Sequence, residues 1–565
     1  MKRLKKIFSL KNLFRFSIGI LVFIVVFCLF FVWFTRIEVP ANCSNKSFER
    51  KRLADHFYTI DQSWIKKNKY GLYEMYVEAD NPYERGLKNG LLSKELVQSQ
   101  EDYFVASIKE IIPSTSYLKF LKYMIKFFDR NIDENIPTEY LQEIYGVSKS
   151  ASNNYDFIGT NYERLLNYHA AHDIGHALQG MNMVVGCTSF GVWGNKCSDS
   201  TMLIGRNFDF YVGDSFAKNK IIEFIHPDKG IDFMMISWGG MIGTVSGMNT
   251  NGLTITINAS KSDYPTGAKT PISLLSREIL QYATTIDEAF AIAKKRETFV
   301  SESILIGSWK DKKSAIIEKS PSKTALFITN ENQIICSNHF QSDTFLNTKE
   351  NQENIKYSTS NYRYQTVEKE LATHAQLNYL DVANILRKRD GKDHEALGLG
   401  NEMALNQLIC HHSIILKPNE LKVWISVGPY QIGEYLCYDL DDIFNTYKGL
   451  TKDIVIYDTA YTIAADSFLF SPLYKDHLNF KQAKQAFTHA AMHGSKMQID
   501  EAFEKGFIAS NPDYYDTYGI LGRYYSGQKN KEKAIYYFNK AISLNNSSLA
   551  EKEYYQKRIQ ESSKK

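Results

Sequence analysis

An apolar stretch near the amino terminus sets the first constraint on the fold. Phe16 to Phe34 contains no charged residue in 19 positions. At about 1.5 Å of helical rise per residue, this length nearly matches a hydrocarbon core roughly 30 Å thick. The stretch is therefore predicted to be a helix that can span a membrane.

The charges on the two sides of this stretch predict its orientation. Six basic residues and no acidic one precede it, whereas the residues just after it balance two bases with two acids. By the positive-inside rule, residues 1–36 form a cytoplasmic tail and a transmembrane anchor, and the rest of the chain lies on the exported side, periplasmic or extracellular. The alternative is a cleaved signal peptide, although the apolar run is long for one and no small-x-small site follows it closely.

Length and composition indicate a folded chain of more than one part. With 565 residues it is too long for one ordinary domain. A net charge of +4 gives no indication of nucleic-acid binding, and the absence of low-complexity tracts indicates little disorder. The seven cysteines are an odd number, and Cys28 lies inside the apolar stretch, so no disulfide framework can be read.

Alternating apolar segments after Cys187 predict an antiparallel β-sheet. Turn-forming clusters separate these segments, and a helical pattern begins just after Pro271 before strands resume. This order fits an α+β body of two stacked sheets covered by helices, whereas the residues before Cys187 are predicted to be mostly helical. The expected strands lie in segments 187–194, 201–210, 220–227, 231–238, 252–260, 302–309, 314–320, 324–330, 333–340, 412–418 and 422–428.

A different organisation is expected near the carboxyl end. Small and aromatic residues recur there at the spacings of a tetratricopeptide unit, which is a pair of closely touching helices. Because one such unit cannot bury its own face, it must pack on the body or on capping helices. Residues 446–479 are predicted to be a connector, and residues 480–565 a tetratricopeptide-like helical region that is a candidate site for a protein partner. The matching residues are Tyr518, Leu521, Gly522, Tyr525, Ala534, Phe538 and Ala541.

Two candidate sites lie close together in the sequence, and the first is a stripe of histidines. His169, His172 and His176 are spaced i, i+3 and i+7, which places them on one face of a helix at a spacing that can bind zinc. The alternative is that this face packs into the core with its imidazoles hydrogen-bonded. The helix also lacks the glutamate of a His-Glu-x-x-His hydrolase.

The second candidate is Cys187, which is accompanied by motifs that resemble a known family. These motifs are "GCTSFGVWG", "LIGRNFDF", "GMNTNGLTITINAS", "CSNHF" and "HSIILKPNELKVWISVG". Together they resemble the acyl-coenzyme A:6-aminopenicillanic acid acyltransferase family (peptidase family C45), a branch of the N-terminal-nucleophile hydrolases related to choloylglycine hydrolases. "NPYERGLKNG" at residues 81–90 is similar to the pro-segment of that family, and the resemblance runs from about Tyr70 to Asp439.

The resemblance implies an αββα sandwich and a precursor that cuts its own chain before the nucleophile. Residues 37–186 would be a mostly helical pro-segment (α chain), and residues 187–445 the hydrolase core (β chain). Cutting between Gly186 and Cys187 frees an α-amino group of pKa about 7.7 to 8.0, which can take the thiol proton at neutral pH. Gly186 has no side chain to block attack on its own carbonyl and tolerates a strained turn.

Four more residues receive roles from the same resemblance. Arg206 would place a guanidinium near the sulfur and favour the thiolate, and Asp209 would orient the amine. Asn258 and Asn338 would be the oxyanion-hole and substrate-orienting asparagines, whose donors stabilise a tetrahedral oxygen by roughly 3 to 4 kcal/mol each.

One arginine of the choloylglycine hydrolases has no clear counterpart in this sequence. Asn361 stands near the position where that arginine is expected, and Arg363 is only its neighbour. The sequence therefore leaves this position of the site unassigned.

The predicted function is hydrolysis of a small N-acyl amide through a Cys187 acyl-enzyme, by a membrane-anchored protein that needs no cofactor and binds no nucleic acid. Hydrolysis is favoured over acyl transfer, because coenzyme A is cytoplasmic whereas the body is exported. Two alternatives stay open. One is a zinc-dependent hydrolase that uses the His169, His172 and His176 stripe, and the other is an inactive interaction protein whose working part is the tetratricopeptide-like unit.

Overall fold

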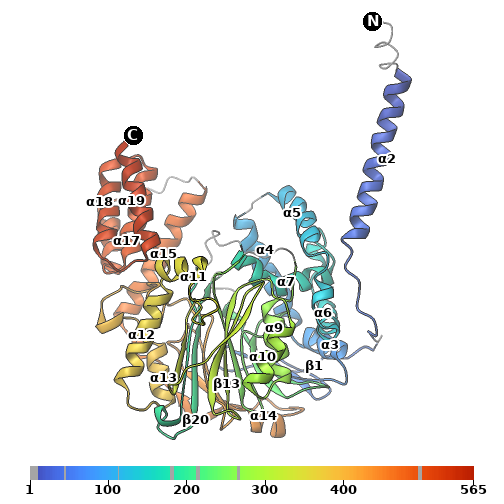
Figure 1. Ribbon diagram of the computed structural model, residues 1–565, viewed down its shortest axis with the longest axis horizontal. Helices are drawn as coiled ribbons and strands as arrows, with labels where there is room; N and C mark the ends of the chain where they lie inside the picture. Colours follow the sequence, from blue (N-terminus) through green and yellow to red (C-terminus); the bar gives the residue numbers. More distant parts are fainter. Residues whose placement is uncertain are drawn as a thin grey trace.

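Two stacked β-sheets form the body of the protein, helices cover both outer faces, and a group of helices follows at the carboxyl end (Figure 1). The computed structural model describes residues 10–43, 46–111, 114–177, 184–211, 217–263, 268–493 and 499–564. The α+β class and the C-terminal helical region expected from the sequence are confirmed.

A long apolar helix, α2 (Leu10–Phe34), stands apart from the body (Figure 1). Its segment Phe16–Phe34 has a mean hydropathy of 2.9 and is not buried, and among the described helices it is the one long and apolar enough to cross a membrane. Near the carboxyl end of α2, the ring of Phe31 lies 6.1 Å from that of Tyr123 in α5 (Thr115–Phe128). The predicted apolar helix is thus confirmed.

The first sheet has eleven strands in the order β1-β2-β3-β4-β9-β10-β11-β12-β13-β14-β15. The strands after Cys187 are antiparallel to one another in this sheet, as expected, and β4, which precedes Cys187, pairs parallel with β9. Parallel strands need a long connection, and residues 79–220 supply it. The strands are β1 (Lys51–Ala54), β2 (Phe57–Ile60), β3 (Ser63–Lys67), β4 (Tyr73–Glu78), β9 (Ile221–His226), β10 (Phe233–Ser237), β11 (Ser246–Asn249), β12 (Leu253–Ala259), β13 (Glu302–Ser308), β14 (Lys313–Lys319) and β15 (Thr324–Phe327).

The second sheet has seven strands in the order β16-β6-β7-β17-β18-β19-β20, all of them antiparallel to their neighbours. A two-stranded ribbon, β5 (Val184–Val185) with β8 (Phe210–Tyr211), extends its central hairpin. The strand β20 lies inside the expected connector, residues 446–479. The strands are β6 (Thr188–Trp193), β7 (Met202–Phe208), β16 (Gln333–Cys336), β17 (His412–Lys417), β18 (Lys422–Ser426), β19 (Tyr435–Asp439) and β20 (Asp458–Ile463).

Three apolar clusters divide the body into four layers. Ile204 of β7 packs in the cluster between the two sheets, and its neighbour Leu203 points to the opposite face, as alternation along a strand requires. That opposite face is covered by α12 (Ser360–Thr373) and α13 (Tyr379–Leu386). The outer face of the first sheet is covered by α9 (Ile272–Tyr282) and α10 (Ile286–Lys295). This helix–sheet–sheet–helix order agrees with the αββα sandwich that the resemblance implies.

The segment before Cys187 is only partly helical. Residues 51–78 form β1 to β4 in place of the helices expected there, because pairing with β9, far away in the sequence, holds β4 in the first sheet. Strands of four to six residues also leave little alternation to recognise. The helices are α3 (Pro82–Leu92), α4 (Lys94–Ile111), α5, α6 (Thr138–Ser148) and α7 (Asn161–Ala177).

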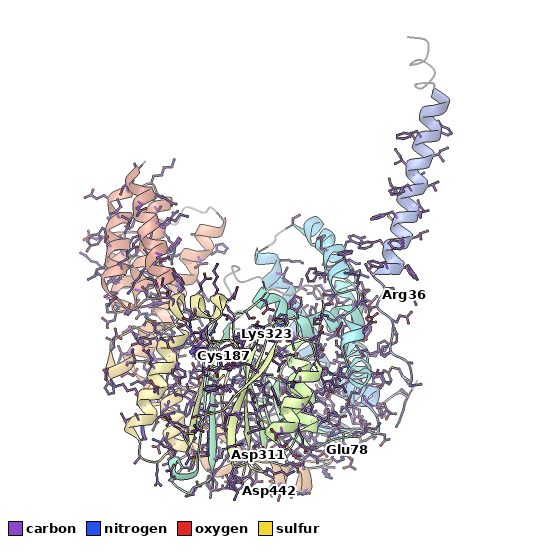
Figure 2. The ribbon with its side chains drawn as sticks, in the orientation of Figure 1. Arg36, Glu78, Cys187, Asp311, Lys323 and Asp442 are labelled. Carbon is purple, nitrogen blue, oxygen red and sulfur yellow. The ribbon has the colours of Figure 1, made fainter. Side chains whose placement is uncertain are left out.

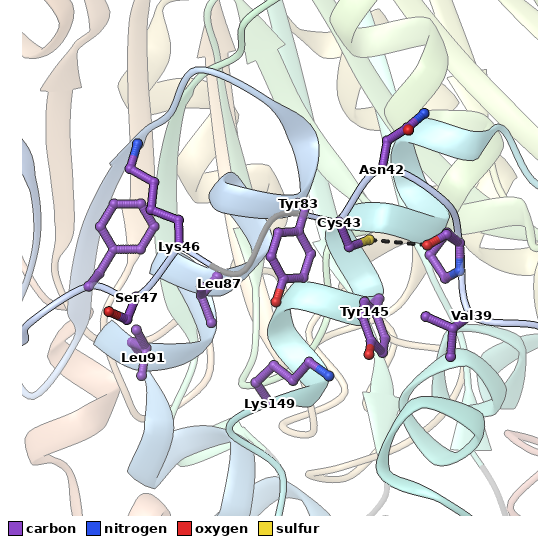
Figure 3. A pocket seen from close by; sticks show the side chains of 12 residues that line it. Val39, Asn42, Cys43, Lys46, Ser47, Tyr83, Leu87, Leu91, Tyr145 and Lys149 are labelled. Carbon is purple, nitrogen blue, oxygen red and sulfur yellow. Dashed lines mark hydrogen bonds between the residues drawn. The ribbon is translucent and has the colours of Figure 1, made fainter.

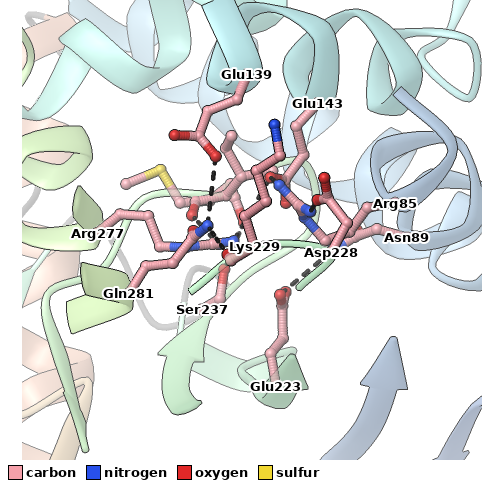
Figure 4. A network of polar contacts seen from close by, with 12 residues as sticks. Arg85, Asn89, Glu139, Glu143, Glu223, Asp228, Lys229, Ser237, Arg277 and Gln281 are labelled. Atoms are coloured by element: carbon pink, nitrogen blue, oxygen red, sulfur yellow. Dashed lines mark hydrogen bonds and ion pairs between the residues drawn. The ribbon is translucent and has the colours of Figure 1, made fainter. Parts of the chain in front are cut away.

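A buried network of charged side chains joins these helices to the body (Figure 4). Arg85 of α3 donates to Glu143 of α6 at 2.8 and 2.9 Å and to Asp228 at 2.7 Å. Arg277 of α9 lies 3.5 Å from the same Glu143 carboxylate. Burial would raise the pKa of Glu143, but the two arginines hold it below its usual value. The network therefore links residues that precede Cys187 to residues that follow it through fixed charges.

Arg85→Met should destabilise the whole chain, because it leaves Glu143 buried without its nearest partner. Removing one side of a buried ion pair typically lowers the free energy of unfolding by about 3 to 5 kcal/mol. Arg52→Met is the control, since the ion pair of Arg52 with Asp55 is exposed and such pairs contribute about 0 to 1 kcal/mol. Denaturant titration of the full chain in detergent measures both changes, and equal effects would show that the network does not stabilise the fold.

The helices at the carboxyl end pack closely on one another. A Cβ at Gly522 of α17 would lie 2.5 Å from the ring of Phe538 in α18, so the two helices approach through glycine. The helices occur where the repeat spacing predicts them, and their assignment as a tetratricopeptide unit stays a prediction. They are α15 (Pro472–His493), α16 (Glu501–Ser510), α17 (Tyr515–Gly527), α18 (Lys531–Ser543) and α19 (Leu549–Lys564), and α14 (Leu440–Thr446) precedes them on the body.

Candidate active site

Cys187 begins a hairpin near the centre of the second sheet. The strands β6 and β7 pair with Ser189 opposite Arg206, and the backbone N–H of Gly186 donates to the carbonyl of Asp209 at 3.0 Å. One hydrogen-bond ladder thus brings Arg206 and Asp209 beside Cys187. Figure 2 shows Cys187 within the body, toward the end of the sheets where α11 (Lys349–Tyr357) lies.

Arg206 is fully buried and reaches from the second sheet to the first. Its guanidinium donates to the carbonyl of Val245 at 2.8 Å, to the hydroxyl of Ser246 and to the carbonyl of Ile257. Its Nη2 lies 3.8 Å from Sγ of Cys187. The acceptors on the first sheet therefore fix a positive charge against the thiol.

The thiol of Cys187 is buried, with 1% of the residue exposed. Burial raises its pKa to about 11, and the nearby charges of Arg206 and Arg363 only partly oppose that rise. In the intact chain the thiol is therefore protonated at neutral pH. Protonation weakens it as a nucleophile, and a base close to the sulfur would raise its reactivity.

Asp209 is a buried carboxylate without a bonded cation. Neither of its carboxylate oxygens accepts a hydrogen bond of ordinary geometry within the part of the chain that the structure describes. Burial raises its pKa to about 7, against the opposing pull of Arg363, Arg206 and the Cys410 thiol. Such an unsatisfied acid is costly to keep in a core, which marks this position as a functional candidate.

Two uncut chains are compared, Cys187→Ala alone (the parent) and Cys187→Ala with Asp209→Asn. As the pH rises, the free energy of unfolding of the double variant should increase relative to that of the parent. Between pH 4 and pH 7 the folded chain holds a proton on Asp209 that the unfolded chain has lost, so the free energy of unfolding of the parent falls through this window. At about 1.4 kcal/mol per pKa unit, the difference between the two variants should change by up to about 4 kcal/mol.

Denaturant titrations at pH 4.5 and pH 7.5 measure this difference. Asp287→Asn, at an exposed position in α10, is the matched control and should show no such trend. A pH-independent effect of Asp209→Asn would mean that the carboxylate is ionised and satisfied in the uncut chain.

Arg363 belongs to the site, although the sequence analysis left this position unassigned. From α12 its Nη1 donates to the backbone carbonyl of Cys187 at 2.6 Å and to the hydroxyl of Thr188 at 2.7 Å. Its Nη2 donates to Oδ1 of Asn338 at 2.7 Å. Burial lowers the pKa of this guanidinium to about 10, so it stays charged at neutral pH. The one signal in the sequence was its place two residues beyond Asn361.

Asn258 and Asn338 lie on either side of the same corner. The amide nitrogen of Asn258 donates to the carbonyls of Cys336 and Ser337 at 2.8 and 3.3 Å, and that of Asn338 donates to the carbonyl of Ala259 at 2.9 Å. In the intact chain these two amides therefore tie the end of β12 to the residues after β16. The structure brings both asparagines close to Arg363 and the hairpin.

Of the three histidines in the stripe, His169 has a described side chain. His169 is buried, and its Nδ1 donates to the carbonyl of Leu165 at 2.7 Å while its Nε2 accepts from the N–H of Ile242 at 2.9 Å. Burial lowers its pKa to about 4, so the ring is neutral. Both ring nitrogens of His169 are thus occupied by backbone groups, as in the packed-core alternative. His172 and His176 lie on α7, but their side chains are outside the described residues.

Among the described residues, no group of three or more His, Cys, Asp or Glu side chains is arranged to hold a metal ion. All seven cysteines are free thiols. A cavity of about 620 Å³ lies where the segment after α2 passes α3 and α6, lined by Tyr83, Tyr145 and Lys149 among others (Figure 3). None of the residues around Cys187 lines it.

The comparisons with known proteins single out the same part of the chain. Residues 194–430 match the acyl-coenzyme A:6-aminopenicillanic acid acyl-transferase family. The matched segment starts just after Cys187 and contains Arg206, Asp209 and Arg363. The chain is similar to this acyl-transferase family over less than half of its length, and Cys187 lies outside the matched segment.

Two curated relatives are similar over part of their length. An uncharacterized protein of Archaeoglobus fulgidus is 26% identical over 278 residues, which are 45% of this chain and 45% of that protein. Protein dcd1A of Dictyostelium discoideum is 21% identical over 305 residues, which are 48% of this chain and 64% of that protein. The chain thus spans about half to two thirds of the relatives it matches.

Three solved structures are also similar. An N-acylethanolamine-hydrolyzing acid amidase ortholog from Caenorhabditis elegans is 15% identical, with 41% of this chain and 93% of that chain covered and a TM-score of 0.30. A variant of conjugated bile acid hydrolase from Clostridium perfringens is 12% identical, with 45% and 93% covered and a TM-score of 0.31. Penicillin V acylase from Agrobacterium tumefaciens is 13% identical, with 48% and 99% covered and a TM-score of 0.29.

Proposed function

We propose that the protein is a self-cleaving cysteine amidohydrolase in which Cys187, freed by cleavage after Gly186, is the nucleophile. Its α-amino group would be the base that the buried thiol lacks in the intact chain. The sulfur would attack the amide carbon of the substrate, the C–N bond would break, and the amine would leave with the thiol proton, delivered by the α-amino group. Water would then hydrolyse the resulting thioester, releasing the acid and restoring the thiol.

The observation that carries this proposal is the unpaired carboxylate of Asp209. Among the described residues, this buried acid accepts no hydrogen bond of ordinary geometry and has only the weak donor of the Cys410 thiol beside it, so its charged form is unfavourable unless a cation arrives. Cleavage would create such a cation next to it, because the new α-ammonium of Cys187 would lie on the neighbouring strand. Asp209 would then hold and orient the amine, and the cost of burying the acid in the precursor would be offset in the mature protein.

The other side chains of the site would stabilise the charges that form during the reaction and hold the backbone of Cys187 in place. Arg206, fixed by carbonyls of the first sheet, would stabilise the thiolate. Arg363 would hold the backbone of Cys187 in register through its carbonyl. Asn338 and Asn258 would supply amide donors to the tetrahedral oxygen, for which Asn258 would have to release a backbone carbonyl that it holds in the intact chain.

A small N-acyl amide is the substrate class we assign, with hydrolysis favoured over transfer. The helix α2 would be an uncleaved anchor with its amino terminus in the cytoplasm, so that the body works on the exported side. Acylated compounds in the membrane would then lie within reach. The C-terminal helices would remain available to a protein partner.

Self-cleavage is the first expected outcome. Purified protein should separate in denaturant into residues 1–186 and 187–565, and the larger fragment should begin at Cys187. Cys187→Ala should stay uncut, whereas Cys187→Ser should cut more slowly, since a hydroxyl is a weaker nucleophile than a thiol at neutral pH. N-terminal sequencing and mass spectrometry read the result, and Cys197→Ala, at another buried thiol, is the control that should still cut. A larger fragment that begins elsewhere would contradict the proposal.

Sensitivity to inhibitors separates this site from a zinc site. Amide hydrolysis by the mature protein should be lost on alkylation of Cys187 and should survive a metal chelator. His169→Gln should disturb folding through its two backbone contacts without removing hydrolysis from the fraction that folds. Release of product from a panel of N-acyl amides measures all three, and loss of activity to the chelator alone would favour the zinc hydrolase.

A further inference from the structure

Gln407 holds the carbonyl of the peptide bond that the proposed cleavage would break. Its Nε2 donates to the carbonyl oxygen of Gly186 at 2.9 Å. Gln407 is 1% exposed, and its Oε1 has no partner within the described part of the chain. A Cβ on Gly186 would lie 2.4 Å from Nε2, so only glycine lets the amide come this close.

The Gln407 amide is positioned to stabilise the negative charge that forms on the Gly186 oxygen during self-cleavage. When the sulfur of Cys187 attacks the carbonyl carbon of Gly186, the carbonyl electron pair moves to the oxygen that Nε2 faces. The thiol proton passes to the departing nitrogen, the C–N bond breaks, and a thioester and a free amine result. Water then hydrolyses the thioester, which restores the thiol and leaves a carboxylate on Gly186. A fixed donor lowers the energy of the intermediate because its dipole is already aimed at the developing charge.

The loop that carries Gln407 is held from two sides. Asn207 of β7 donates to the carbonyl of Leu405 at 2.8 Å, and the earlier part of the loop, residues 398–402, is held by the C-terminal region. Asn511, which follows α16, exchanges two hydrogen bonds with the backbone of Leu399 at 2.8 and 2.9 Å. Asn401 donates to the carbonyl of Asn546, which follows α18, at 2.9 Å. Gly398 has φ +79°, and a Cβ there would lie 2.4 Å from the backbone nitrogen of Tyr514. The segments between the C-terminal helices thus contact this loop through asparagine side chains and through one close approach of the backbone at Gly398.

Two further contacts fix the same loop. Glu402 accepts from the hydroxyls of Tyr514 and Tyr515 at 2.7 and 3.1 Å. Leu408, the residue after Gln407, has φ +52°, a conformation that a leucine keeps only when its surroundings impose it. Its side chain packs with Ile432 and Phe468. The position of the Gln407 amide therefore depends both on the sandwich, through Ile432 and the carbonyl of Leu405, and on the residues that follow it, through Phe468, Tyr514 and Tyr515.

We infer that Gln407 is the oxyanion donor of self-cleavage and that the C-terminal helices control cleavage by setting its position, an inference that rests on the proposed function. The C-terminal region would then act as a folding checkpoint: the chain is cut efficiently only after the helices have docked.

Gln407→Leu in the full chain tests the donor. It should slow cleavage by about 10² to 10³-fold, the usual effect of losing one oxyanion donor. Gln431→Leu is the matched control, because Gln431 is also a buried glutamine whose Oε1 lacks a partner in the described residues, yet its weak bond goes to Leu386 at 3.4 Å. Time courses of uncut chain on gels give the rates, and unfolding midpoints of both variants in the Cys187→Ala background check the fold. Equal rates for the two variants would overturn the donor role.

Asn511→Ala tests the control by the helices. It should slow cleavage by less than Gln407→Leu does, and it should have no additional effect in a Gln407→Leu chain, because Asn511 acts through Gln407. Asn530→Ala is its control, since Asn530 caps α18 in the same region without touching the loop. If the two substitutions slow cleavage independently, so that their fold-changes in rate multiply in the double variant, the helices stabilise the chain without positioning Gln407.

The outcomes for the inference and for the proposed function differ. If the wild-type chain is never cut before Cys187, the proposed function itself is wrong. If it is cut there and Gln407→Leu cuts at the wild-type rate, the proposed function stands and this inference falls.

Discussion

A guanidinium buried between two sheets is the interaction on which the site depends. Arg206 belongs to the second sheet, but its hydrogen bonds go to backbone carbonyls at the edge of β11 and near the end of β12 in the first. An arginine in a core must have such acceptors, because an unpaired buried charge costs several kcal/mol. The same bonds that make it tolerable also fix its distance from the Cys187 sulfur. Sheet packing and the electrostatics of the thiol are therefore set by one side chain.

The part of the site carried by one hairpin could be predicted from the sequence. The motifs that contain Cys187, Arg206 and Asp209 carry the family resemblance from which these residues received their roles, and the hairpin of β6 and β7 brings them together. Arg363 and Gln407 could not be found in this way. Each reaches the Gly186–Cys187 peptide from another layer of the body. Packing between layers decides which helix turn or loop faces Cys187, and the spacing of residues along one segment does not reveal that packing.

The same distinction applies to the fold. The apolar helix, the two stacked sheets and the late helices follow from periodicity along continuous segments. Residues 51–78 form short strands in place of the expected helices, and their state is decided by pairing with β9 after a connection that contains α3 to α7. Long-range strand pairing of this kind overrides the secondary-structure propensity of the segment, and it cannot be predicted from the local sequence pattern.

The parallel pairing of β4 with β9 also bears on how such a protein can be made. β4 precedes the peptide bond before Cys187 and β9 follows it, so the two products of a cut there would remain neighbours in one continuous sheet. Either product alone would present a bare row of unpaired N–H and C=O groups at a central strand, a surface that invites aggregation. Synthesis as one chain avoids that exposure, because the two halves of the sheet pair before they are ever separate molecules. A division of this polypeptide into two genes would have to protect those edges first.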